Sequence, residues 1–383
     1  MKIFIPRESD AAEQRAPLVP DAVKRLVELG AEVEIEGGLG RSIDCEDESY
    51  ASSGAGVSGD RAASLGAADL VIRLGAPSAE DIEALKAGAI HISHLDPFRR
   101  RRLIAALARK GISAICMELI PRTTLAQKMD SLSSQASLGG YVAVILAAER
   151  LKKIFPMMMT PAGTIAASRV FVVGAGVAGL QAIATARRLG ARVEAFDTRP
   201  AVEEQVQSLG ARFVKIDVGE TGQTRDGYAK ELTEEQIRKQ REAMARHCAA
   251  ADVVITTAQV FGRAAPRIVT GEMLAGMKPG SVVVDMAVET GGNVEGSHAG
   301  EEVVIGGVRV IGLTRLPARV AVHASQMYAS NIVNLIEHFW NKDNATLNLD
   351  LEDEIMQGCL LTHQGEVRNE TIRHLIGADK EEV

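Results

Sequence analysis

The chain has 383 residues, of which 46% are hydrophobic and 24% charged, and its formal net charge at pH 7 is −7. This composition is typical of a soluble globular protein and excludes collagen, coiled coil and general disorder. The acidic balance argues against nucleic acid as a partner, because proteins that bind it usually carry a basic excess. At about 150 residues per domain, the length predicts two or three domains.

The N-terminus and the cysteines bear on the cellular compartment. We find no apolar run that approaches the roughly 18 residues of a membrane-spanning helix, and Met1–Arg7 lacks the apolar stretch of a secretory signal. We therefore expect a cytoplasmic protein. The four cysteines lie far apart without a CxxC pair, so we expect no metal site and no disulfides. They are Cys45, Cys116, Cys248 and Cys359.

Short apolar runs alternate with amphipathic stretches up to about residue 118. Between the first two runs, residues 21–29 have helical apolar spacing, and Gly30 supplies a C-terminal cap. The basic run Arg99–Arg102 is expected at the solvated end of a helix. Strands that alternate with helices predict parallel βαβ units. The runs predict strands at 2–5, 31–35, 69–74, 89–93 and 113–117.

A second set of strands follows, flanked by two long apolar-periodic stretches, 131–154 and 318–340, which we interpret as helices. The fold class expected is therefore α/β, with two Rossmann-like domains of mostly parallel sheet, the second inserted in the first and joined to it by long helices. The expected domains are 1–130 with 320–383, and 131–319. The strands of the second set are predicted at 169–173, 191–196, 211–216, 252–257, 281–286 and 308–313.

The strongest chemical signal is a glycine motif that follows the buried strand 169–173 and opens a helix. In this GxGxxG pattern Gly174 makes a tight turn, Gly176 lets the backbone approach a pyrophosphate, and Gly179 lets the helix pack close to the strand. The free N–H groups and positive dipole end of the helix then face the phosphates.

The next strand ends at Asp197, eighteen residues after Gly179. A carboxylate there accepts hydrogen bonds from both hydroxyls of the adenosine ribose and would repel a 2′-phosphate, so NAD(H) is favoured over NADP(H). Arg199 lies two residues later and is able to neutralise a phosphate, which leaves NADP(H) as the alternative.

Two polar segments remain. Residues 117–141 place Arg122, Gln127, Asp130 and Ser133 where the chain passes between the expected domains, beside the expected nicotinamide cleft. The alternative is a polar loop in which Asp130 or Ser131 caps the following helix. The second segment, 217–236, contains Tyr228 and is expected to be a closing lid or a docking surface.

Three stretches resemble the NAD(H)-binding component of proton-translocating nicotinamide nucleotide transhydrogenase. They are 121–144, 155–193 with its PMMMT and AGLQAIATA runs, and 277–293. The resemblance covers essentially the whole chain and implies the alpha subunit of a Re/Si-specific NAD(P)+ transhydrogenase. In that reaction hydride passes directly from NADH to NADP+ on a partner subunit.

The resemblance also implies residue roles. Arg122, Gln127, Asp130 and Ser133 would lie around the nicotinamide, and Tyr228 in a mobile loop at about 217–231 would close over the nucleotide. The implied cofactor-binding residues are Gly174, Gly176, Val177, Ala178, Gly179, Asp197, Thr198, Arg199, Tyr228, Ala258 and Gln259.

The partners implied by the resemblance are a second copy in a homodimer, an NADP(H)-binding beta subunit, and a membrane-spanning subunit through which protons move. The chain would then lie peripherally on the inner face of the cytoplasmic membrane. Two stretches, 260–266 and 312–318, depart from the usual family pattern near the expected cofactor cleft.

Alanine dehydrogenase is a near relative and provides the alternative function, an amino acid oxidoreductase. Its catalytic lysine falls on Gly75 here, and its histidine falls on Asp96, with His94 two positions early. A nucleotide-binding docking module without turnover is a further alternative.

Overall fold

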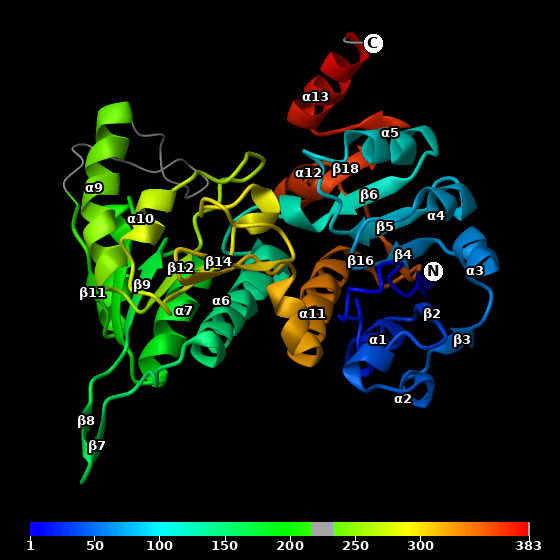
Figure 1. Ribbon diagram of the computed structural model, residues 1–383. Helices are drawn as coiled ribbons and strands as arrows, with labels where there is room; N and C mark the ends of the chain where they lie inside the picture. Colours follow the sequence, from blue (N-terminus) through cyan, green and yellow to red (C-terminus); the bar gives the residue numbers. More distant parts are fainter. Residues whose placement is uncertain (217–232, 382–383) are drawn as a thin grey trace. The chain divides into compact units, whose positions relative to one another are not determined.

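Figure 1 shows the protein as a computed structural model, which describes residues 1–216 and 233–381. The expected mobile loop at 217–231, with Tyr228, lies outside these residues. The chain forms two compact units, the first made of 1–135 and 320–383 and the second of 136–319. The sequence placed the first boundary after residue 130. The structure groups 131–135 with the first unit, where the side chains of Ser134 and Gln135 bond to residues 324 and 331.

The first unit contains an eight-stranded sheet in the order β19-β18-β6-β5-β4-β1-β2-β3. Its parallel strands are β1 (Lys2–Ile5), β2 (Glu32–Glu36), β3 (Gly56–Ser58), β4 (Leu70–Ile72), β5 (Ile90–Ser93) and β6 (Ser113–Cys116). The antiparallel strands β18 (Leu360–His363) and β19 (Glu366–Val367) extend the sheet beyond β6. The sequence missed β3, β18 and β19, because β3 is short and exposed and the other two pair with a strand far away in the chain.

Helices flank this sheet (Figure 1). They are α1 (Pro20–Glu28), α2 (Asp47–Ser52), α3 (Arg61–Ala67), α4 (Ala79–Ala84), α5 (Arg101–Arg109), α11 (Ala321–Phe339), α12 (Glu354–Cys359) and α13 (Glu370–Glu381). A small hairpin of β16 (Trp340–Asn341) and β17 (Thr346–Leu347) follows α11. The predicted helix 318–340 therefore begins at Ala321, after a 3-10 turn at Leu316–Val320, and ends where Trp340 enters β16.

The second unit contains a seven-stranded sheet in the order β11-β10-β9-β12-β13-β15-β14. The parallel strands are β9 (Arg169–Val173), β10 (Arg192–Phe196), β11 (Arg212–Phe213), β12 (Val253–Thr256), β13 (Val282–Asp285) and β15 (Val308–Ile311). Its helices are α7 (Val177–Arg188), α8 (Glu203–Ser208), α9 (Glu234–Ala250) and α10 (Gly271–Ala275). The strand predicted at 211–216 is therefore only two residues long.

Two hairpins of the second unit were not predicted. β14 (Glu302–Ile305) runs antiparallel to β15 through the turn Gly306–Gly307, in which both φ angles are positive. A two-residue Gly-Gly loop between apolar runs is a known hairpin signal, so this strand was open to prediction. The other hairpin, β7 (Met158–Thr160) with β8 (Gly163–Ile165), lies between α6 (Ser131–Arg150) and β9.

The central strands are apolar on both faces, as expected for parallel sheet covered by helices. In β1, Ile3 and Ile5 pack into a cluster with residues of α1 and α11, while Phe4 packs on the opposite face with residues of α5. In β9, Phe171 and Val173 pack against α9 and α10, and the alternate residues are equally buried. Each sheet therefore lies inside its unit, and its carboxyl edge is left to carry functional loops.

The predicted helix 131–154 ends at Arg150, and it corrects one expectation. Contrary to the sequence prediction, this helix, α6, is long and apolar enough to cross a membrane, and half of the apolar stretch is buried inside the protein. The core helix of a soluble protein passes the same test. Within the first unit, Gln135 Nε2 donates to Ala324 O at 3.0 Å and Ser134 Oγ donates to Asn331 Oδ1 at 2.7 Å.

A buried charged cluster fixes the carboxyl edge of the first sheet. Arg73, which follows β4, is 1% exposed and bonds to the carboxylate of Asp81. Arg61 grips the same carboxylate through Nε and Nη2, both at 2.8 Å. Burial raises the pKa of Asp81, but the Arg61 hydrogen bonds and the charges of Arg73 and Arg61 outweigh it, so its pKa lies well below the usual value. Arginine and carboxylate charges of this kind are tolerated inside a protein because they are paired.

His91 lies on β5 beside this cluster and is completely buried. Its Nε2 is 3.0 Å from Ser93 Oγ, whereas Nδ1 has no partner. Burial, reinforced by the charge of Arg73, lowers the pKa of His91 to about 3. The folded protein therefore holds this histidine neutral under acidic conditions in which an unfolded chain protonates it.

This histidine predicts acid sensitivity. Between the ordinary histidine pKa near 6.5 and a pKa of about 3, the unfolded state binds one more proton, so the free energy of unfolding falls as the pH falls. From pH 7.5 to pH 5 we expect wild-type protein to lose about 2 kcal/mol more than the His91→Asn variant. Denaturant titrations at both pH values measure this difference. His323→Gln, at an exposed position on α11, should keep the wild-type slope, and equal slopes for wild type and His91→Asn would refute the assignment.

Candidate functional site

The loop between β9 and α7 has the geometry that a dinucleotide-binding turn requires. Gly174 has a φ of +97°, and a Cβ atom there would lie 2.5 Å from Thr257 Oγ1. Only glycine adopts this conformation in this space without strain. The sharp turn directs the chain from the end of the buried strand straight into α7.

Gly179 and Gly176 differ in what surrounds them. A Cβ atom on Gly179 would lie 1.9 Å from Gly174 O, so α7 packs directly on the turn. A Cβ atom on Gly176 would meet nothing within 4 Å, so the space beside this residue is open. The first glycine of this pair is needed by the fold, and the second leaves room for a ligand.

Val177 and Ala178 form the start of α7. Gly176, the N-cap, supplies no side-chain hydrogen bond to the first turn, so the backbone N–H groups there remain suited to an anion. From the other side, a Cβ atom on Gly140 of α6 would lie 2.2 Å from Ala178 O. The Gly139–Gly140 pair, which the sequence left without a role, lets α6 approach this helix start closely.

Asp197 follows β10, and its side chain is 7% exposed. Its Oδ2 accepts from the N–H of Ala175 at 2.7 Å, and its Oδ1 accepts from the N–H of Arg199 at 2.8 Å. The Arg199 guanidinium completes an ion pair, with Nη2 2.9 Å from Oδ2. The carboxylate is therefore fixed against the glycine turn, and Arg199, with Thr198 between them, directs its charge to Asp197.

Ala258 and Gln259 follow β12 at the same carboxyl edge. The backbone of Ala258 exchanges two hydrogen bonds with the side chain of Asn293, N–H to Oδ1 at 3.0 Å and Nδ2 to O at 2.8 Å. Gln259 is exposed and donates from Nε2 to Met286 O at 3.2 Å. The loop after β12 is thus tied to the loop after β13.

The sequence missed the residue that holds these loops, Asp285 at the end of β13. It is fully buried, and its carboxylate accepts from the N–H groups of Ala287, Asn293 and Val294 at 3.0–3.1 Å. Gly292 passes so close that a Cβ atom there would lie 2.7 Å from Asp285 Oδ2. The VDMAVETGGN run carried this signal, as an acid after a strand followed by a Gly-Gly-Asn turn.

The four residues expected around the nicotinamide lie in the first unit. Asp130 Oδ1 accepts from Ser133 N–H at 2.9 Å, and Ser133 Oγ donates to Asp130 Oδ2 at 2.5 Å. Asp130 therefore caps α6, which is the alternative interpretation of this segment. Arg122 and Gln127 are exposed. An open hollow of about 670 Å³ is lined by Thr124, Leu125, Gln127 and Lys128.

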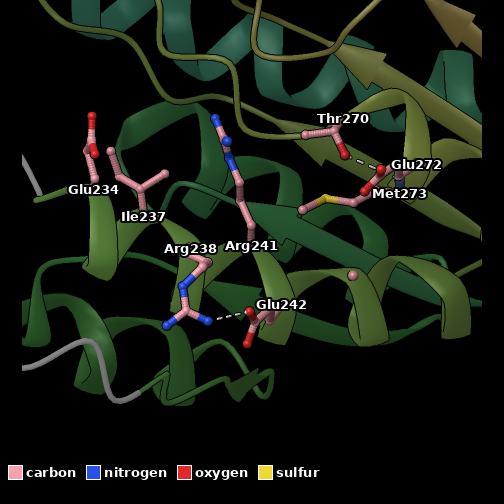
Figure 2. A pocket seen from close by; sticks show the side chains of 9 residues that line it. Glu234, Ile237, Arg238, Arg241, Glu242, Thr270, Glu272 and Met273 are labelled. Atoms are coloured by element: carbon pink, nitrogen blue, oxygen red, sulfur yellow. Dashed lines mark hydrogen bonds and ion pairs between the residues drawn. The ribbon is translucent and has the colours of Figure 1, made fainter.

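A second hollow, of about 710 Å³, lies between α9 and α10 in the second unit (Figure 2). Arg238 Nη1 is 2.8 Å from Glu242 Oε1, while Arg241 extends from α9 between Ile237 and Thr270. Its wall carries charges of both signs and includes none of the residues predicted for the cofactor. Within 1–216 and 233–381, no three His, Cys, Asp or Glu side chains come together as a metal site.

A parallel sheet whose first strand enters this glycine turn, with a carboxylate after the second strand, defines a Rossmann-type dinucleotide-binding unit. The chain belongs to the alanine dehydrogenase/PNT family, since residues 4–139 match its N-terminal domain and 143–370 its C-terminal domain. It is 44% identical to an NAD(P) transhydrogenase subunit alpha of Rhodospirillum rubrum, over 96% of this chain and 97% of the relative.

Solved structures agree with this membership. A transhydrogenase from Sinorhizobium meliloti is 44% identical, covers 97% of this chain and 100% of its own, and superimposes with a TM-score of 0.85. An L-alanine dehydrogenase, 22% identical with 99% of each chain covered, gives a TM-score of 0.82 and shows the shared fold. The predicted resemblance and the α/β fold class are confirmed, and the membership supports an oxidoreductase that binds NAD(H).

The two glycines make a matched pair of variants. Gly176→Ala places a methyl group in open space, so we expect a free energy of unfolding within about 0.5 kcal/mol of wild type but NADH affinity at least about tenfold weaker. Gly179→Ala forces its methyl group into Gly174 O and should cost about 2 kcal/mol or more. Thermal unfolding and NADH fluorescence titration separate the two effects. Unchanged NADH affinity in Gly176→Ala would contradict the proposed pyrophosphate position.

Proposed function

We propose that this chain is the NAD(H)-binding component of a proton-translocating transhydrogenase, and that hydride passes directly between its nicotinamide and that of NADP(H) on a partner subunit. The observation that carries the proposal is the glycine turn with open space at Gly176 and Asp197 fixed beside it. The similarity to a transhydrogenase alpha subunit over nearly the whole chain supports it.

The second unit would hold the nucleotide. The α7 start, with Val177 and Ala178, would receive the pyrophosphate, and Asp197 would accept the ribose hydroxyls, aided by Thr198 and Arg199. Ala258 and Gln259 would border the nucleotide after β12, at the loop that Asn293 fixes. Tyr228, outside the described residues, belongs to this proposal by resemblance alone.

The proposed reaction needs no general acid or base, because a reduced ring becomes oxidised and the other ring the reverse, without a proton transfer in that step. The requirement is orientation of two rings and exclusion of water, which is able to supply about 7–11 kcal/mol. The histidine nearest the unit 1 sheet edge fits this picture. His94 is buried, its Nε2 is 2.8 Å from Ser131 Oγ, and burial lowers its pKa.

We propose that the segment from Arg122 to Ser133 provides that orientation. Asp130 fixes the start of α6 through Ser133, so the preceding loop has a rigid attachment. Arg122 would then hydrogen-bond the nicotinamide carboxamide, and Gln127 would hold the neighbouring ring or its ribose. Asp130 and Ser133 would act as positioning residues in this arrangement.

The partners follow from the same proposal. They are an NADP(H)-binding beta subunit, a membrane-spanning subunit that moves protons, and a second copy of this chain. The chain would lie against the inner face of the cytoplasmic membrane. The alternative, an alanine-dehydrogenase-like activity, has the shared fold in its favour. Against it stands Gly75 at the expected lysine position, where a Cβ atom would already lie 3.2 Å from Glu8 Oε2.

One experiment tests the proposal. The purified chain is mixed with an NADP(H)-loaded beta component, and hydride transfer from NADPH to an NAD analogue is followed by absorbance. Transfer that requires both proteins is the expected result. Reduction of NAD by the chain alone with alanine would instead establish the amino acid oxidoreductase, and binding of NADH without transfer in the mixture would establish a docking module.

Gln127 allows the orientation step to be tested separately. We expect Gln127→Asn to bind NADH within about twofold of wild type while hydride transfer slows by about 10–100-fold, because a short displacement of a positioning group misaligns the rings. Stopped-flow transfer and equilibrium titration measure the two quantities. Gln14→Asn, at an exposed glutamine of the same unit, is the control. Loss of NADH binding with normal transfer would overturn the assignment.

Asp197 sets the cofactor preference in this proposal. Asp197→Asn removes the charged acceptor and releases Arg199, so we expect about tenfold weaker NADH binding or more, together with a higher affinity for NADPH relative to NADH. Fluorescence titrations with both nucleotides measure the ratio. Glu194→Gln, on the same strand β10, should leave both affinities unchanged. An unaltered ratio in Asp197→Asn would contradict the ribose assignment.

A further inference from the structure

The hairpin of β7 and β8 is exposed along its whole length. Every residue from Pro156 to Ala166 is exposed, while the base is firmly held. Ser168 N–H donates to Phe155 O at 3.0 Å and Ser168 Oγ donates to Ile154 O at 2.7 Å, and Phe155 and Ser168 are buried. Figure 1 shows the hairpin extending away from the helices and sheet of its own unit. We call residues 156–166 the methionine arm.

The methionine arm has the wrong composition for a segment surrounded by water. None of its eleven residues is charged. Met157, Met158, Met159 and Ile165 are 58%, 44%, 74% and 50% exposed. Met158 pairs with Ile165 across the strands, and Met159 pairs with Thr164 on the other face. Since side chains alternate between faces, both faces of the hairpin present apolar groups.

An isolated two-stranded hairpin is only marginally stable in water, and this one also leaves the outer edges of both strands open. Such an arm requires a protein surface that covers its apolar faces. A lipid bilayer does not fit, because open backbone N–H and C=O groups find no hydrogen-bond partners in hydrocarbon. A surface chosen by charge does not fit either, since the arm has none.

The same unit carries a surface of matching chemistry on α6. Tyr141 and Ile145 lie four residues apart on one face of this helix and are 41% and 37% exposed. A stripe of this kind on a helix presents a flat apolar face, and thioether sulfur packs favourably against aromatic rings. Methionine side chains are also flexible enough to adapt to such a surface.

We propose that the methionine arm of one copy packs on the Tyr141–Ile145 stripe of a second copy, in a reciprocal, two-fold exchange. In a two-fold contact each patch is used twice, so one arm per chain covers two arms and two stripes. This arrangement buries all the uncharged arm surface without requiring another protein. The inference rests on the homodimer included in the proposed function and does not depend on hydride transfer.

The test is sedimentation velocity on the full chain across a concentration series. We expect wild type to be dimeric at micromolar concentration, and Met159→Glu to weaken dimerisation by about 100-fold or more, because it buries an unpaired charge in each copy of the contact. Val304→Glu is the matched control, because Val304 is 63% exposed on β14 of the same unit but outside the arm. It should remain dimeric.

A second measurement identifies the receiving surface. Equal amounts of Met159→Cys and Tyr141→Cys chains are mixed under mild oxidation, and a disulfide-linked pair containing one of each variant is expected. A monomeric wild type at about 100 µM, an unaffected Met159→Glu dimer, or the absence of the mixed pair would each overturn the proposal. NADH titration of Met159→Glu should match wild type, so failure of the arm proposal is distinguishable from failure of the cofactor proposal.

Discussion

The close approach of α7 to the turn after β9 is the constraint on which the rest of the second unit depends. The helix begins within a few residues of the strand because Gly179 has no side chain to hold it away from Gly174 O. That contact sets where the first N–H groups of α7 point and where the open space at Gly176 lies. Asp197 then fixes the turn from the neighbouring strand through the N–H of Ala175. A single missing methyl group thus determines the shape of the proposed phosphate site.

The carboxyl edges of both sheets are held by buried carboxylates that bond to backbone or arginine. In the second unit, Asp285 organises the loop after β13, and Asn293 connects that loop to the one after β12. In the first unit, Asp81 joins Arg73 and Arg61 beneath the loops. Charged groups in these places are costly to bury unless their lone pairs are used. Rigid loops result from these bonds, and loops on a rigid sheet are where α/β proteins bind ligands.

The sequence predicted what local patterns determine. Runs of β-branched residues indicated the central strands, and the glycine spacing with Asp197 indicated the turn of the second unit. Patterns that depend on distant partners were missed. Strands β18 and β19 join a sheet whose other strands lie more than two hundred residues earlier, and Asp285 has a role only because Asn293 returns to it. Asp130 shows the limit of a polar motif, since its hydrogen bonds to Ser133 are those of a helix cap. The roles proposed for Arg122 and Gln127 around a nicotinamide remain predictions.

The Asp197–Arg199 pair has a consequence for how a nucleotide arrives. A carboxylate already balanced by its own neighbour, with Arg199 Nη2 at 2.9 Å, presents little net field to an approaching molecule. Ribose hydroxyls are neutral, so nothing in this ion pair draws the nucleotide in from a distance or repels its diphosphate. Recognition there is a matter of short-range geometry, and ionic strength should barely affect it.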